Sequence, residues 1–155
     1  MKLSVRAIIF VIYLFRKIRN TDCLCNAGYV DVNEPPLNPP ESARSYSGVL
    51  YDGAPGSWFA RSMLNSANSW MPARENDDQW MKVDMGSIME VSGVAIQNQN
   101  VFGVTRINVE HSIDNVIFTS TGTGLDVVWR YNTVITNVFF QNVVEAKWVI
   151  IRPKA

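Results

Sequence analysis

Residues 76–86 read NDDQWMKVDMG, and their apolar and polar side chains alternate from position 81 onward. Successive side chains of a β-strand point to opposite faces, so this alternation predicts a strand with two different faces. Both faces cannot be exposed to solvent, and at least one has to pack inside the protein. One face carries Trp80, Lys82 and Asp84, and the other carries Met81, Val83 and Met85.

The face that holds Trp80 and Asp84 places an indole beside a carboxylate. This combination predicts a core tryptophan and an acid that is held by hydrogen bonds or by an arginine, because an unpaired buried carboxylate is costly. We expect Arg61 or Arg152 to be the partner of Asp84.

Similar short runs, rich in β-branched and aromatic residues, continue along the chain between turn residues. Within VTRINVEH, Val104, Ile107 and Val109 are interleaved with polar residues, although not in perfect register. No stretch of a dozen residues carries a helical stripe. The pattern predicts an all-β fold, an antiparallel β-sandwich or jelly roll with loops gathered at its two ends. Strands are expected within residues 58–65, 79–85, 91–97, 104–112, 116–121, 133–140 and 147–153.

Length and charge limit the classes of function. The 155 residues fit one domain, and 18% charged residues is typical of a globular protein. The first 20 residues hold five basic side chains and no acid, which leaves nine basic and fourteen acidic side chains in residues 21–155. A body with a net charge of about −5 argues against nucleic acid as a partner and against purely electrostatic attachment to anionic lipid. Membrane contact would require insertion of apolar side chains.

Residues 1–27 are expected to form a leader that resembles a signal peptide. Two basic residues precede the apolar run AIIFVIYLF at 7–15, which fits a signal-peptide core and is shorter than the ~20 residues that span a bilayer. The basic RKIRN at 16–20 is unusual before a cleavage site, so an amphipathic leader is the alternative. The leader predicts an extracellular, secreted protein.

The leader is followed by a proline-rich segment at residues 28–42. Four prolines in two pairs exclude an interior strand or helix and predict an extended lead-in to a domain at residues 43–155. Cys23 and Cys25 are the only cysteines, and one intervening residue makes a disulfide between them strained. Two cysteines are also too few for a structural zinc site.

With its surroundings, NDDQWMKVDMG resembles the discoidin domain family, also called the coagulation factor V/VIII C-type domain. The resemblance covers residues 43–153 and implies a jelly-roll β-sandwich of the galactose-binding-like group. It also implies a last strand and a final cysteine beyond Ala155, so we expect this domain to lack its last strand and Cys25 to be free or in an intermolecular disulfide. The matching segments are ARSMLNS at 60–66, WMPA at 70–73, NDDQW at 76–80, VDMG at 83–86, VSGVAIQ at 91–97, VTRINVEHSIDNVIF at 104–118 and AKWVIIRP at 146–153.

Loops at one end of the sandwich bind phospholipid head groups, glycans or proteins in this family. By resemblance, these loops are residues 48–58, 69–78 and 98–103, and aromatic and amide side chains within them are suited to sugars. Phe59 is expected to turn inward, and packing of the aromatics under their own loop is the alternative. Trp70 is expected in the core. The candidate ligand-binding residues are Tyr51, Trp58, Asn98, Asn100 and Phe102.

No catalytic residue, metal site or cofactor is predicted. His111 is the single histidine and has no matched acid or nucleophile, which favours a structural role. TGTG at 121–124 reads as a loop and does not form a phosphate-binding turn before a helix. The acidic cluster Glu75, Asp77 and Asp78 lacks EF-hand spacing, and we expect a solvated loop there.

These features predict a non-catalytic extracellular recognition module that binds a cell-surface or matrix glycan or glycoprotein. Insertion of apolar loop side chains into a membrane that contains phosphatidylserine, an anionic phospholipid, is one alternative. Protein adhesion without a small ligand is another, and an enzyme of the β-sandwich hydrolase kind is the most distant.

Overall fold

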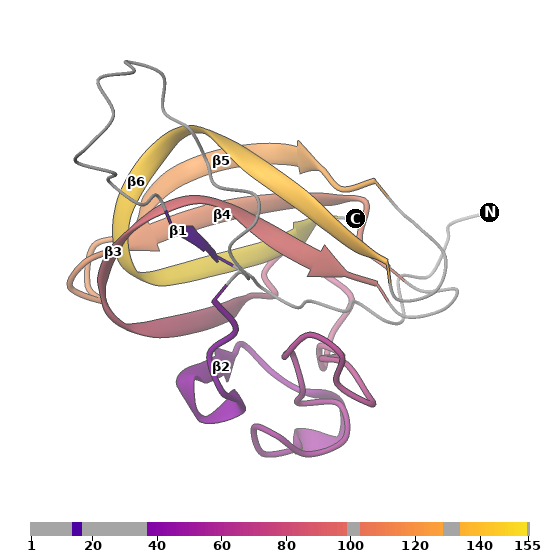
Figure 1. Cartoon of the computed structure of the whole chain (residues 1–155). Coiled ribbons are helices and arrows are strands. Elements are labelled where there is room, and N and C mark those ends of the chain that lie inside the picture. Colours follow the sequence, from indigo (N-terminus) through magenta and orange to yellow (C-terminus); the bar gives the residue numbers. More distant parts are fainter. Residues whose placement is uncertain (1–13, 17–36, 99–102, 129–133, 155) are drawn as a thin grey trace, which may run out of the picture.

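A computed structural model describes residues 14–16, 37–98, 103–128 and 134–154. Within these ranges the chain contains β-strands and two short 3-10 helices but no α-helix, which confirms the all-β prediction. None of the described residues belongs to a helix that could cross a bilayer. Cys23 and Cys25 lie outside the described residues. The elements are β1 (Leu14–Arg16), η1 (Glu41–Ala43), β2 (Arg44–Tyr46), η2 (Leu50–Asp52), β3 (Met81–Gln97), β4 (Arg106–Ser112), β5 (Thr119–Asp126) and β6 (Ile135–Lys154) (Figure 1).

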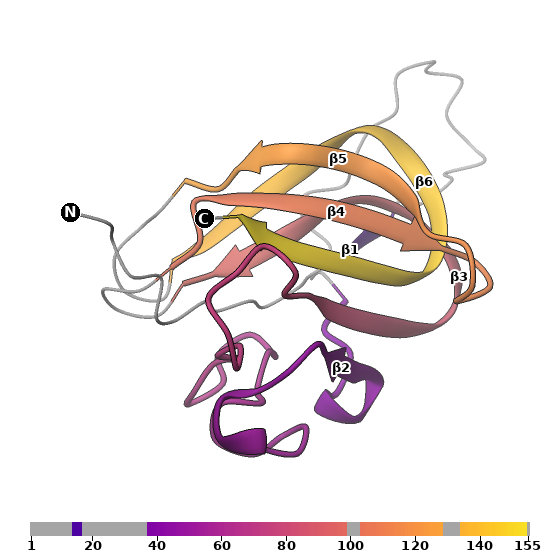
Figure 2. The ribbon, with the colours of Figure 1, turned by 180° about the vertical axis from the view of Figure 1, so that it is seen from behind.

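Two long strands, β3 and β6, organise the sandwich. They contain 17 and 20 residues and pair antiparallel from Met81↔Ile151 to Gln97↔Ile135. Their register shifts between Asp84 and Met89, where each ribbon curves from one layer into the other (Figures 1 and 2). The sequence predicted two separate strands in each of these regions, and the structure joins each pair into one continuous strand.

The remaining strands complete two layers, as predicted. The first half of β3 lies between β2 and the second half of β6, and β4 and β5 follow on the far side of β6. The second half of β3 pairs with the first half of β6 and with β1, whose register is Leu14↔Val94 and Arg16↔Val91. All of these pairings are antiparallel. Strand β1 lies within the segment expected to be the leader.

The core is formed by the inward faces of the two layers. Along β3, the side chains of Met81, Val83 and Met85 are buried. Trp80 lies on the opposite, outer face and is only half-buried, so the prediction that it is a core residue is wrong. The reason is that only one face of each layer is covered by the other layer. Trp70 was predicted in the core and is fully buried.

Asp84 on this outer face does not pair with an arginine. Its Oδ1 atom accepts a hydrogen bond of 2.8 Å from the backbone N–H of Gly86. Arg61 donates instead to the carbonyl of Gly56, and Arg152 pairs with Glu110. The expected partnership is therefore wrong, because a half-exposed carboxylate can be satisfied by a local backbone donor and water.

Two predictions of local structure also differ from the fold. Residues 58–65 form turns and bends in place of a strand, and Trp58 and Asn65 have φ angles of 21° and 61° that interrupt an extended backbone. Residues 121–124, expected as a loop, lie inside β5, where Val109 of β4 pairs with Gly122. Gly124 has a φ angle of 60°, and glycine tolerates this irregularity within a strand.

Candidate functional site

An aromatic hollow lies in the loops between β2 and β3, which gather in the lower part of Figure 1. Tyr51 and Trp58 are 82% and 73% exposed, whereas Phe59 is partly buried and packs against the core, as predicted. The ring centroids of Tyr51 and Trp58 lie 6.0 Å and 6.4 Å from that of Phe59. We call this surface the aromatic cradle, a cavity of about 380 Å³ lined by Leu50, Tyr51, Gly53, Ser57, Trp58 and Phe59.

The backbone of the cradle adopts unusual conformations. Tyr51, Asp52 and Trp58 have φ angles of 62°, 52° and 21°. Such conformations are costly for residues other than glycine and persist where the surrounding structure holds them, often at binding sites. Here the backbone N–H of Leu50 donates to the carbonyl of Met71 at 2.8 Å, which ties the first loop to the second.

Glu41 holds the segment that follows the cradle residues in the chain. Its Oε1 atom accepts hydrogen bonds from the backbone N–H groups of Ser62 and Met63 at 2.7 and 2.9 Å. Its Oε2 atom accepts a hydrogen bond of 3.0 Å from the hydroxyl of Tyr46. Burial raises the pKa of the Tyr46 phenol, which therefore stays a donor at neutral pH. Glu41 belongs to the segment that the sequence predicted as a lead-in.

Arg44 fastens the same lead-in segment to the domain. It is 3% exposed and donates to the carbonyls of Pro39 and Ser62, and to the side chain of Asn38. Burial lowers the pKa of its guanidinium, but arginine stays charged in proteins. Sequence reasoning missed Glu41 and Arg44, because no periodic pattern marks a charged side chain that is held by contacts remote in the chain.

Asn98 is the one candidate ligand-binding residue of the third loop that the structure describes. Asn98 is 3% exposed, and its side chain exchanges hydrogen bonds with the backbone of Val104 at 3.1 and 3.4 Å. The prediction that Asn98 binds a ligand is therefore contradicted, because its amide closes its own loop. Asn100 and Phe102 lie outside the described residues.

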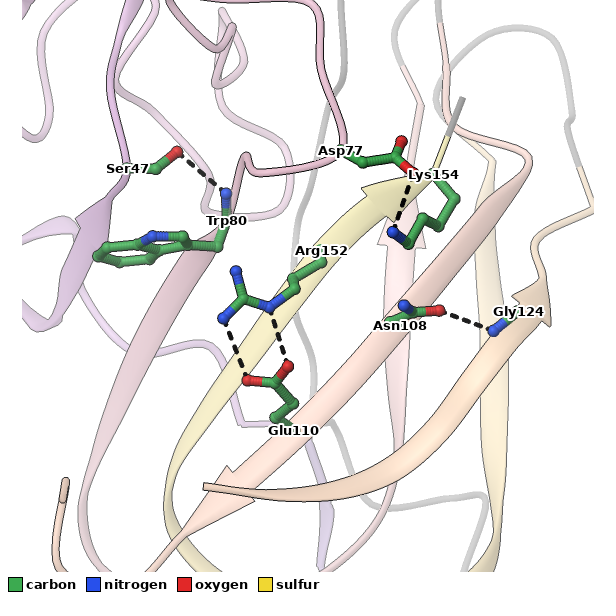
Figure 3. Close-up of polar contacts among 8 residues, drawn as sticks. All are labelled: Ser47, Asp77, Trp80, Asn108, Glu110, Gly124, Arg152 and Lys154. Carbon is green, nitrogen blue, oxygen red and sulfur yellow. Dashed lines mark hydrogen bonds and ion pairs between the residues drawn. The ribbon is translucent and has the colours of Figure 1, made fainter. Parts of the chain in front are cut away.

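The second loop is held near its C-terminal end, where the chain enters β3. The Ser47 hydroxyl accepts a hydrogen bond from the backbone N–H of Trp80 at 3.0 Å, and Asp77 forms an ion pair of 3.0 Å with Lys154 (Figure 3). Among the residues that the structure describes, no group of acidic, histidine or cysteine side chains is arranged to hold a metal ion. Asp77, part of the acidic cluster in the sequence, is instead engaged by a lysine.

The outer face of β4 and β6 is occupied by contacts within the sheet. Arg152 and Glu110 form a two-point ion pair at 2.9 and 3.3 Å, and Asn108 accepts a hydrogen bond from the backbone N–H of Gly124 (Figure 3). The Nδ1 atom of His111 lies 2.6 Å from the hydroxyl of Thr121. Burial lowers the pKa of this histidine, which therefore favours its neutral form.

Comparison with known proteins agrees with this fold. One similar structure is chitosan-binding module 2 in complex with chitotriose. The module is derived from a chitosanase/glucanase from Paenibacillus sp. IK-5, and the comparison has a TM-score of 0.54 and 19% identity. Module 1 from the same source has a TM-score of 0.54 and 22% identity. Each alignment covers 75% of this chain, with 86% of module 2 and 84% of module 1.

At these identities the likeness establishes a shared fold. A search of curated protein sequences found no match. The family model of the F5/8 type C domain matches residues 42–155, which is most of the chain and includes the cradle and both layers of the sandwich. The chain therefore belongs to the F5/8 type C domain family.

Proposed function

We propose that this domain is a non-catalytic carbohydrate-binding module that holds a saccharide in the aromatic cradle. The observation that carries the proposal is the pair of exposed rings, Tyr51 and Trp58, whose centroids both lie within 6.4 Å of that of the partly buried Phe59. Exposed aromatic rings offer a large apolar surface with a polar edge, on which the C–H face of a pyranose packs. The chitotriose bound by a module of the same fold supports this class of ligand.

Charge narrows the class of saccharide. Residues 21–155 carry a net charge of about −5, and the exposed Asp52 follows Tyr51 at the rim of the cradle. This balance favours neutral sugars and amino sugars over acidic glycans. Chitotriose is therefore the first probe to test, followed by an array of neutral glycans.

We place this activity outside the cell, on glycans of cell surfaces or matrix. The support is the leader-like apolar run at residues 7–15, which is preceded by basic residues. Secretion of the full chain from eukaryotic cells, followed by N-terminal sequencing of the released protein, tests the location independently of binding.

The binding proposal is tested by calorimetric titration with chitotriose and with hits from the neutral-glycan array. We expect Trp58→Ala and Tyr51→Ala each to weaken binding by about tenfold or more. Val116→Ala is the matched control, because Val116 is 79% exposed but lies outside the cradle. Equal affinity of Trp58→Ala and the unmodified protein would overturn the proposal.

Two other outcomes would replace it. Sedimentation with phosphatidylserine vesicles that persists in high salt and is lost in Trp58→Ala would identify the cradle as a membrane-insertion site. Absence of binding to both glycans and vesicles would leave protein adhesion as the function of the cradle.

A further inference from the structure

A second and larger hollow, which we call the groove, lies apart from the aromatic cradle, beside the sheet that contains β2, β3 and β6. Its volume is about 650 Å³, which falls within the usual range of ligand pockets. It shares no lining residue with the cradle. The floor is formed by Lys82, Asp84 and Trp148, the turn residue Asn115 closes one side, and Pro39 and Pro40 form a wall.

Strand register brings the three floor residues together. Asp84 of β3 pairs directly with Trp148 of β6, so their Cβ atoms lie ~5 Å apart on the outer face of the sheet. Lys82 is two residues before Asp84 and points to the same face, ~7 Å further along the strand. An ammonium, a carboxylate and an indole therefore share an area comparable to that of one or two sugar rings.

Hydrogen bonds hold the polar side chains of this floor in place without using all of their donors and acceptors. The Lys82 Nζ atom donates one hydrogen bond, of 2.7 Å, to the side-chain oxygen of Asn115. Asp84 accepts from Gly86 through Oδ1, and no donor among the described residues bonds to Oδ2. Two residues that line the hollow thus keep further hydrogen-bonding capacity, donors on Lys82 and an acceptor on Asp84, which suits neighbouring sugar hydroxyls.

Trp148 supplies an apolar platform beside these groups. It is half-buried, and the Nζ atom of Lys147 lies 4.4 Å from the centroid of its ring. Trp148 lines the groove and Lys147 does not, so this contact leaves the indole as part of the groove surface. An indole fixed next to hydrogen-bonding groups is the combination that binds a pyranose with both its C–H face and its hydroxyls.

Charge in the groove is balanced. Lys82 and Asp84 offset each other, and the positive charge of Arg44, another lining residue, is offset by the nearby carboxylate of Glu41. A ligand with a large net charge would meet no compensating charge here. The groove is therefore suited to a neutral ligand.

We propose that this groove is a second saccharide-binding site, which takes a neutral oligosaccharide independently of the cradle. Trp148 stacks on a pyranose ring, Lys82 donates to one of its hydroxyls, and Asp84 accepts from a neighbouring hydroxyl. A proline-rich peptide is the competing occupant, since aromatic grooves also bind such peptides, but those grooves use several aromatic rings and this one is lined by a single ring.

The test follows the indole N–H signals of the full chain labelled with ¹⁵N-tryptophan, with the Trp58 and Trp148 signals assigned by Trp58→Phe and Trp148→Phe. Cellotriose, maltotriose and lactose are the neutral probes, and a proline-rich decapeptide is the competing probe. We expect a neutral oligosaccharide to shift the Trp148 signal saturably, and to do so equally in the Trp58→Ala variant, whose cradle is disabled.

Variants of the floor complete the test. Asp84→Asn keeps an oxygen that can accept from Gly86, and Lys82→Gln keeps a donor to Asn115, so both preserve the local fold. Each is expected to weaken the Trp148 titration by about tenfold, whereas the exposed Glu145→Gln should not change it. A shift of the Trp58 signal alone would overturn the groove proposal and support the cradle proposal. A shift of the Trp148 signal alone would support the groove proposal and overturn the cradle proposal. No response of Trp148 to any of the sugars, or a response to the peptide only, would also overturn the groove proposal.

Discussion

Glu41 accepts a hydrogen bond of 2.7 Å from the backbone N–H of Ser62, which lies 21 positions later in the chain. This contact joins a 3-10 helix at the start of the domain to the segment that follows the cradle residue Phe59 in the chain. The region matched by the family begins at residue 42, so the acceptor of this contact lies just before it. The segment that follows the cradle residues in the chain is thus held by a contact that is remote in sequence.

Replacing Glu41 is expected to loosen this support. Glu41→Ala leaves the N–H groups of Ser62 and Met63 without their acceptor, and we expect the free energy of unfolding to fall by about 1–3 kcal/mol. Glu41→Gln keeps one side-chain oxygen and should lose less. Urea unfolding measures both, with the exposed Glu145→Ala as the control. Equal stability of Glu41→Ala and that control would contradict the role given to Glu41.

Backbone strain at Tyr51 gives a second prediction. With a φ angle of 62°, Tyr51 occupies a conformation that glycine adopts more easily than alanine. Tyr51→Gly and Tyr51→Ala both remove the ring from the cradle, so both should lose saccharide affinity. Tyr51→Gly should nevertheless be more stable than Tyr51→Ala by about 0.5–1 kcal/mol in thermal unfolding. The reverse order would show that the loop does not hold this conformation in solution.

The fold could be predicted to a large extent, because burial leaves a direct mark on alternating sequences. Met81, Val83 and Met85 alternate with polar residues, and they do form the buried face of β3. The curvature that carries β3 from one layer to the other could not be predicted, since it arises from the shifted pairing with β6. Trp80 was misassigned because the sequence does not show which face of β3 the second layer covers.

Within the candidate site, the exposure of Tyr51 and Trp58 could be predicted from the turn residues between them. Tyr51 and Trp58 flank a glycine- and proline-rich turn, and both are exposed. Asn98 could not be assigned in this way, because an amide that bonds a ligand and an amide that closes its own loop look identical in a sequence. Trp148 was predicted as part of a strand only, and its place in the groove depends on the register that sets it opposite Asp84.

The ion pair between Glu110 and Arg152 gives a third prediction. Its side chains are 26% and 29% exposed and make two contacts, a geometry that contributes more than a fully exposed pair. A double-mutant cycle with Glu110→Gln and Arg152→Gln should yield a coupling energy of about 1 kcal/mol. The same cycle on Arg106 and Asp126, which are 3.5 Å apart and mostly exposed, should yield much less. Equal coupling in the two cycles would contradict this ranking.

His111 predicts how the stability of the domain depends on pH. Burial lowers the pKa of His111 from its ordinary value of 6.5, so the unfolded chain binds the proton more readily than the folded domain. Above that value both states are neutral and the histidine has no effect. As the pH falls below it, the unfolded state gains protons first, and the free energy of unfolding decreases until the folded domain is protonated as well.

This effect should appear as a difference in slope between two proteins. Between about pH 7.5 and pH 5, the unmodified protein should lose more stability in urea unfolding than His111→Gln, which cannot take up this proton. Asp114 does not interfere, because hydrogen bonds from the N–H groups of Ile117 and Val116 lower its pKa below the ordinary value of 3.8, and its contribution is lost only at lower pH. Parallel slopes for the two proteins across this range would show that His111 has the same pKa in the folded domain and in the unfolded chain.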